Sequence, residues 1–155
     1  MIYTIIIMSE PVKLFKRYKN KYLRVLGNKA LYDDELQRIG KEQLKPFNGV
    51  YPQDKFINKN GYQIINTSNS DDMKGEHWVA LYKTPKNLYV YDSFGRNTNN
   101  LLPGLTKKMK GGGNIKIIDS DYDKEQRGES QVCGQLCMSW LCVVRDLGIR
   151  KALQI

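Results

Sequence analysis

The distribution of apolar and polar positions along the chain predicts helices towards both ends and strands between them. From Val132 to Leu147, apolar residues recur at 132, 136, 137, 140, 141, 143, 144 and 147, the spacing of a largely buried helix. The stretch before it, from Gln126 to Ser130, is polar and turn-prone. The pattern therefore predicts that a buried helix begins close to Cys133.

Two amphipathic segments lie in the first third of the chain. Residues 11–26 read as a helix, with Ser9 as its cap and Pro11 in its first turn. Residues 31–44 read as a second helix, although Gly40 in its interior weakens that prediction. For the apolar residues that open the chain we expect an edge strand or a flexible end (residues 1–10), and translation could equally start at Met8.

Alternation of apolar and polar residues predicts strands in the middle of the chain. Residues 77–83 and 88–95 alternate on either side of a turn at Thr84-Pro85-Lys86-Asn87, which indicates a hairpin. Tyr62–Thr67 is an expected strand before it. The remaining expectations are a turn-rich stretch at 46–60, a short basic helix after Pro103 and a strand at 114–119.

The order of these elements is helix, helix, strand, hairpin, short helix, strand, buried helix. It fits an α+β domain in which a mixed sheet packs against the cysteine-bearing helix. With 155 residues, 41% of them hydrophobic, the chain has room for one compact domain over residues 1–155 and hardly for two.

The expected position of Cys133 suggests chemistry. The free N–H groups and the dipole of a helix's first turn stabilise a thiolate, the reactive form of cysteine. The backbone N–H of Cys133 and the side-chain amide of Gln126, seven residues upstream, could together form an oxyanion hole. A lone cysteine here is more often a small apolar residue at the edge of a core. Partner residues must decide between the two interpretations.

The chain has one histidine, so the partners can be sought by arithmetic. If the hairpin is centred between Thr84 and Pro85, facing residues have numbers that sum to 169, and His77 stands opposite Asp92. Asp92 could then accept the Nδ1 proton of His77 and turn Nε2 towards a thiol, as in a Cys-His-Asp triad. Either residue alone would more often be structural, but the combination with Cys133 and Gln126 favours a triad.

Three segments carry a resemblance to a known family. IINTSNSDDMKGEHWVALY, YVYDSFG and QRGESQVCGQLC resemble the adenain family of maturation proteases, found in adenoviruses, virophages and transposons, and more distantly the ubiquitin-like-protein proteases. In that family an aromatic residue follows the catalytic His, an acidic residue comes shortly before Phe-Gly, and a Gln lies seven residues before Cys-Gly. The resemblance covers roughly residues 47–147 and implies a papain-like fold of the adenain type.

The resemblance also implies roles for single residues. His77 would be the general base, Asp92 the residue that orients it, Gln126 the oxyanion donor and Cys133 the nucleophile. Trp78 would flank the substrate channel, whereas strand alternation turns it towards the core; both interpretations stay open. The implied activity is a cysteine endopeptidase that cleaves viral capsid precursors at Gly-containing sites during particle maturation. It would act as a monomer in the virion and at the host-cell assembly site.

The charge of the chain points to a further partner. The net charge is +9, and half of the residues from 13 to 24 are Lys or Arg, which suggests salt-sensitive binding to a polyanion such as DNA. A basic face that serves only solubility is equally plausible, and a membrane surface is less favoured. The resemblance favours DNA, because adenain uses it as a cofactor. The basic residues concerned are Lys13, Lys16, Arg17, Lys19, Lys21 and Arg24.

The three cysteines, all between 133 and 142, indicate a reducing compartment and not a disulfide framework. Their spacing is not that of a zinc site, so no metal is expected. No cofactor is needed for the chemistry, although DNA or an activating peptide could stimulate it. Two alternatives remain: a protease for ubiquitin-like modifiers, which would share the triad, and a non-enzymatic basic DNA-binding virion protein.

Overall fold

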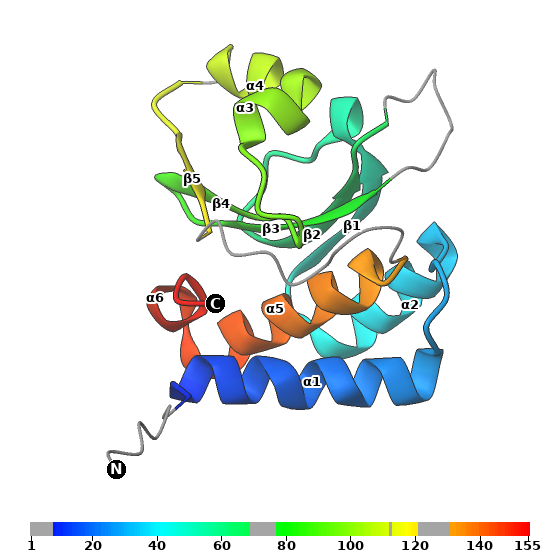
Figure 1. The fold of residues 1–155 in the computed structure, drawn as a ribbon. Helices are drawn as coiled ribbons and strands as arrows, with labels where there is room; N and C mark the ends of the chain where they lie inside the picture. Colours follow the sequence, from blue (N-terminus) through cyan, green and yellow to red (C-terminus); the bar gives the residue numbers. More distant parts are fainter. Residues whose placement is uncertain (1–7, 69–76, 112, 121–130) are drawn as a thin grey trace.

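In the described part of the chain, five strands form one sheet, and helices cover both of its faces (Figure 1). The computed structural model describes residues 8–68, 77–111, 113–120 and 131–155. The helices are α1 Glu10–Leu26, α2 Asp33–Gln43, the 3-10 turn η1 Gln53–Lys55, α3 Thr98–Leu101, α4 Pro103–Lys110, α5 Cys133–Leu147 and α6 Ile149–Ala152. The strands are β1 Phe47–Pro52, β2 Gly61–Asn66, β3 Trp78–Lys83, β4 Asn87–Tyr91 and β5 Lys116–Asp119.

The sheet is mixed, with the strands in the order β1-β2-β3-β4-β5. The central strands β2, β3 and β4 pair antiparallel, whereas β1 joins β2 and β5 joins β4 in parallel. All residues of β2 are buried, as expected for an inner strand covered on both faces. The expectation of an α+β domain with a mixed sheet is confirmed.

Each face of the sheet has its own hydrophobic core. On one face lie α1, α2, α5 and α6, and on the other lie α3 and α4 (Figure 1). The larger core joins α1, α2 and α5 to the side chains of Tyr62, Ile64, Ala80 and Tyr91. The smaller core joins α4 to the opposite side chains, among them Ile65, Val79, Leu81, Leu88 and Val90.

Helix α5 lies between the sheet and α1 (Figure 1). Its residues from Cys133 to Val144 are all buried, as predicted from the apolar spacing and as expected for a helix covered on every side. The ring of Tyr91 on β4 stacks on Trp140 with centroids 5.3 Å apart, and it meets the edge of Phe15 on α1 at 6.1 Å. One sheet residue thus contacts both helices.

The expectation of a merely turn-rich stretch at 46–60 was wrong, because β1 lies within it. Gly49 and Pro52 obscured this strand, and its register with β2 shifts between Phe47 and Val50. Proline and an irregular register are tolerated at the end of a sheet, where β1 lies in the described part of the chain. The short helices α3 and α6 were also not predicted. The possible edge strand at the N-terminus falls largely on residues 1–7, outside the described residues.

Gly40, which weakened the prediction of the second helix, has a packing role. A Cβ built on Gly40 would lie 2.3 Å from the ring of Phe47 on β1. The absence of a side chain therefore lets α2 and β1 approach each other. The sequence signal against a helix was a signal of close helix–strand contact.

We expect Gly40→Ala to lower the free energy of unfolding by about 1–3 kcal/mol, because the new methyl group overlaps the Phe47 ring. Helix propensity alone would favour alanine by about 1 kcal/mol, so the sign of the change tests the contact. Chemical denaturation measures it. The control is Gly111→Ala, where the nearest atom would lie 3.7 Å away and little change is expected. A more stable Gly40→Ala variant would contradict the prediction.

Candidate active site

Cys133 is the first residue of α5, as the apolar pattern predicted. The preceding residue, Val132, gives the helix no side-chain cap. The backbone hydrogen bonds of the helix begin with the bond from Leu136 N–H to Val132 C=O at 3.0 Å. Cys133 is 8% exposed. The backbone N–H of Trp78, the first residue of β3, donates to Cys133 Sγ at 3.4 Å. Helix α5 and strand β3 therefore meet at this sulfur.

His77 immediately precedes β3, and its position is fixed by both its backbone and its side chain. Its carbonyl accepts the N–H of Thr67 at 2.9 Å, which continues the β2–β3 ladder by one residue. Its side chain is buried, and Nε2 lies 2.5 Å from Asp92 Oδ1. The imidazole also lies close enough to Cys133 for each group to shift the pKa of the other. The structure thus brings together three of the four predicted site residues.

Two details of the predicted contact were wrong. Facing residues in the β3–β4 hairpin have numbers that sum to 171, not 169, so the extended register places His77 opposite Phe94. Since the shift is by two residues, His77 and Asp92 stay on the same face of the sheet and meet diagonally. The ring of Phe94 lies 5.2 Å from that of His77.

The second detail is the ring nitrogen that faces each partner. Nε2, not Nδ1, is the nitrogen of His77 that contacts Asp92. The contact with Asp92 is therefore made by the other ring nitrogen than the one predicted. The order of the three groups is unchanged, because imidazole can donate through one nitrogen and accept through the other.

Asp92 follows the end of β4 and is almost fully buried. Besides His77 it binds Arg96, whose backbone N–H and Nε both donate to Oδ2, at 2.9 and 2.8 Å. Sequence reasoning missed Arg96. The signal was present in DSFGR, where a glycine lies between the acid and the arginine: Gly95 has a φ of 68° and turns the chain back towards the carboxylate.

The hydrogen bonds of these groups outweigh the cost of burying charge. Burial opposes the ionised form of each, yet bonds to Asp92 and Cys133 raise the pKa of His77 above its ordinary value. Bonds from His77 and from the N–H groups of Trp78 and Gly134 lower the pKa of Cys133 against the effect of burial. Bonds from His77 and Arg96 hold the pKa of Asp92 well below its usual range, again against burial. The arrangement favours a thiolate–imidazolium pair.

The other two cysteines have the opposite character. Burial raises the pKa of Cys137, one turn along α5, and it raises the pKa of Cys142 as well. Cys142 shares a hydrogen bond of 3.3 Å with the hydroxyl of Tyr22 on α1. All three thiols are free and buried. Cys133 alone among them is arranged to ionise.

Gln126, the predicted second oxyanion donor, lies outside the described residues. Of the two predicted donors, the one that the structure describes is the backbone N–H of Cys133, at the start of α5. Leu31 covers this point: a Cβ on Gly134 would lie 3.2 Å from its side chain. A side chain at 134 would crowd Leu31, so glycine at this position eases the close approach of Leu31 to the helix start.

Trp78 joins the site to the segment between α1 and α2. Its ring packs against the larger core, and its indole N–H donates to Leu31 C=O at 2.9 Å. From α5, the side-chain amide of Gln135 donates to the carbonyls of Gly27 and Lys29, at 2.8 Å each. Trp78 thus faces the core, as alternation predicted. Its hydrogen bond to Leu31 also holds the segment between α1 and α2 in place beside Cys133.

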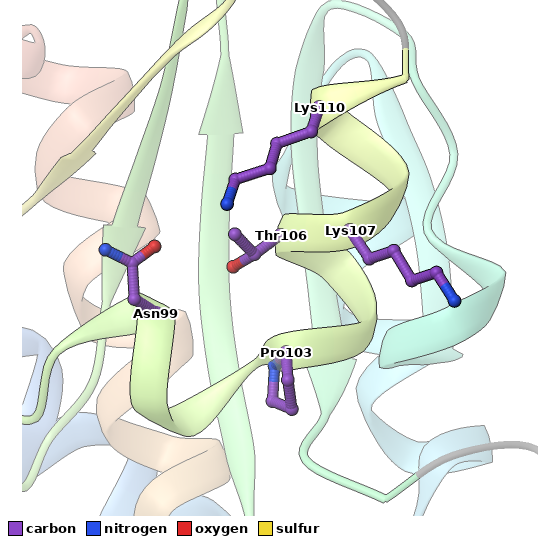
Figure 2. A pocket seen from close by; sticks show the side chains of 5 residues that line it. All are labelled: Asn99, Pro103, Thr106, Lys107 and Lys110. Carbon is purple, nitrogen blue, oxygen red and sulfur yellow. The ribbon is translucent and has the colours of Figure 1, made fainter.

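Two basic hollows lie away from the thiol. One, of about 570 Å³, runs along α1 and includes Arg17, Lys21 and Arg24. The other, of about 410 Å³, lies between α3 and α4 (Figure 2). In Figure 2 the side chain of Lys110 extends over Thr106 towards Asn99, whereas Lys107 points the other way. The cations of the second hollow do not converge on one point, so we assign it no ligand.

Within the described ranges no three His, Cys, Asp or Glu side chains gather as metal ligands. No helix in that part of the chain is both long and apolar enough to cross a membrane. The chain matches no protein-family model and no curated protein. The assignment of a function therefore depends on the geometry around Cys133.

We expect Cys133 to react with iodoacetamide at a pH below that needed for an ordinary thiol, because its pKa is lowered, while Cys137 and Cys142 stay slow. His77→Gln removes the imidazole that lowers the pKa of Cys133 and should slow labelling at neutral pH roughly tenfold or more. Peptide mapping by mass spectrometry at a series of pH values measures both.

The control for this experiment is Cys142→Ala, which removes a thiol from the core and leaves the site intact. It should keep the labelling profile of Cys133. A Cys133 that titrates like a free cysteine in the folded parent would contradict the arrangement.

Proposed function

We propose that the chain is a cysteine endopeptidase of the adenain type. One observation carries the proposal: a thiol at the start of a buried helix, an imidazole just before the neighbouring strand and a buried carboxylate lie together, with the imidazole bonded to the carboxylate and coupled electrostatically to the thiol. The fold type is part of the proposal. It is supported by the packing of α5 on a mixed sheet in which the base lies just before β3 and the acid just after β4.

In this mechanism His77 takes the proton of Cys133, and the thiolate attacks the carbonyl carbon of a peptide bond, forming a C–S bond. The negative charge on the carbonyl oxygen is stabilised by the Cys133 N–H and, by resemblance, by Gln126. His77 gives its proton to the leaving amine as the C–N bond breaks. It then takes a proton from water, which attacks the thioester, and the C–S bond breaks to release the acid and the thiol.

Asp92 keeps the imidazole in place and stabilises its charged form. Its Oδ1 fixes Nε2, so the imidazole ring cannot rotate without losing a bond of 2.5 Å. The carboxylate is itself buried and multiply bonded, which holds it ionised at neutral pH. This order of groups is that of a Cys-His-Asp triad.

The low exposure of Cys133 favours a substrate with small side chains at the cleavage site. Because Cys133 is only 8% exposed and Leu31 covers the adjoining helix turn, an extended chain with small residues fits best at the cut. The resemblance implies Gly at or next to that position and viral capsid precursors as natural substrates. We propose that cleavage takes place during particle maturation, in the virion and at the reducing assembly site of the host cell.

A protease for ubiquitin-like modifiers would share this chemistry and differ in substrate surface. A Gly-Gly-ended modifier and a capsid precursor with a Gly-containing site separate the two, since each protease should process only its own class. A non-enzymatic DNA-binding virion protein would cleave neither. That alternative leaves the lowered pKa of Cys133 and the buried His77–Asp92 contact without a purpose.

DNA is the proposed stimulating partner. The outer side of α1 carries exposed Lys13, Lys16, Arg17, Lys21 and Arg24, while Phe15 and Tyr22 point into the core. A helix anchored through its aromatic residues can present cations along its length, and phosphate contacts from such cations release counterions. The aromatic residues pack and are not free to stack on bases.

We expect the parent protein to hydrolyse a fluorogenic peptide ending in Leu-x-Gly-Gly at low salt, and Cys133→Ala and His77→Gln to lose at least about 10³-fold in rate. Asp92→Asn should lose less than either, since Asp92 acts through His77, although the amide keeps only one of the two accepting oxygens. Initial rates by fluorescence measure this. A Cys133→Ala variant as active as the parent would exclude the proposed nucleophile.

DNA binding is expected to depend on the basic side of α1. Replacing Arg17, Lys21 and Arg24 with Gln should lower the slope of log K against log salt by up to about 3 and reduce any stimulation of cleavage by DNA. Fluorescence anisotropy with a labelled duplex measures the slope. The matched control replaces Lys86, Lys107 and Lys110, which removes the same charge elsewhere. Equal weakening by both sets would show that net charge alone drives binding.

A further inference from the structure

Both oxygens of the Asp92 carboxylate accept hydrogen bonds. Arg96 contacts both oxygens, whereas His77 contacts one. Oδ1 contacts His77 Nε2 at 2.5 Å, Phe94 N–H at 3.3 Å and an Arg96 terminal nitrogen at 3.4 Å. Oδ2 accepts the backbone N–H and Nε of Arg96. Arg96 therefore holds the carboxylate in the rotamer that presents Oδ1 to the imidazole.

The guanidinium is itself held in place. Its central carbon lies 5.0 Å from the centre of the Phe94 ring, and that ring lies 5.2 Å from the ring of His77. The planar cation thus sits on one aromatic ring while its Nε reaches the acid. Arg96, Phe94, Asp92 and His77 form a closed cluster around one buried charge.

We propose that Arg96 is a positioning residue of the active site, which aligns Asp92 and balances its charge so that the Cys133–His77 pair forms at neutral pH. This inference rests on the proposed function. In the ion-pair form Cys133 and Asp92 are negative, and His77 and Arg96 are positive, so the four charges cancel. Without Arg96 the cluster carries an uncompensated negative charge that favours a proton on both the thiol and the imidazole.

The other titratable groups around the pair do not replace this cation. Of the described residues packed against it, α5 contributes the thiols of Cys133 and Cys137, and the turn after β4 contributes Arg96. Besides His77, Arg96 is the one cation that binds Asp92 within the described ranges. Its side chain is 47% exposed, so solvent weakens its effect on pH dependence but not its hydrogen-bond geometry.

The test is the pH dependence of Cys133 alkylation in the full chain, which needs no peptide substrate. Arg96→Gln should move both midpoints, for thiolate formation and for imidazolium deprotonation, upward by roughly 0.3–1 pH unit. Arg96→Lys keeps the charge and loses the fork, so its midpoints should stay near those of the parent. Peptide cleavage by Arg96→Lys should fall roughly tenfold in kcat, with little change in KM.

The matched control is Arg150→Gln, which removes an exposed cation from α6, beyond the far end of α5. It should shift neither midpoint. Parent-like midpoints and cleavage in Arg96→Gln would overturn the role of Arg96, as would equal shifts in the Gln and Lys variants. If Arg96→Gln fails to fold, Arg96→Lys decides: a parent-like kcat overturns the proposal. A parent whose Cys133 titrates as an ordinary thiol would instead overturn the proposed function, and this inference with it.

Discussion

The burial of α5 between the sheet and α1 is the constraint on which the rest of the structure depends. Because the helix is covered on all sides from Cys133 to Val144, its first residue cannot shift relative to β3 without opening the core. The sulfur accepts a hydrogen bond from the N–H of Trp78, so the spacing between thiol and imidazole is set by packing as much as by polar contact. A large apolar interface thereby fixes a small polar site.

Burial opposes the charged form of each ionisable group in this site, and electrostatic contacts favour it. The charged forms of His77, Asp92 and Cys133 are all disfavoured by desolvation, and hydrogen bonds among neighbours restore them. Such a cluster is stable only when each member is satisfied, since an unpaired buried charge costs several kcal/mol. This explains why a fourth group, Arg96, completes it from the partly exposed side.

Much of the fold could be predicted because its elements differ in hydrophobic period. The apolar spacing of α5 and the alternation of β3 and β4 identified them and the start of the Cys-bearing helix. The register of the hairpin could not be fixed, since turn chemistry at Thr84 and Pro85 permits more than one centre. The predicted register was wrong by two residues, which leaves His77 and Asp92 on the same face of the sheet. Their contact was therefore predicted although the register was not. Strand β1 was missed because it lies at the end of the described sheet and breaks its pattern with glycine and proline.

The segment between α1 and α2 has a thermodynamic consequence for ligand binding. Three of its carbonyls, at Gly27, Lys29 and Leu31, are held by side-chain amide and indole N–H groups from α5 and β3. The conformational entropy of this segment is therefore lost when the chain folds. A ligand that binds against this segment meets a preorganised surface. Its binding then costs the conformational entropy of the ligand but not that of the segment.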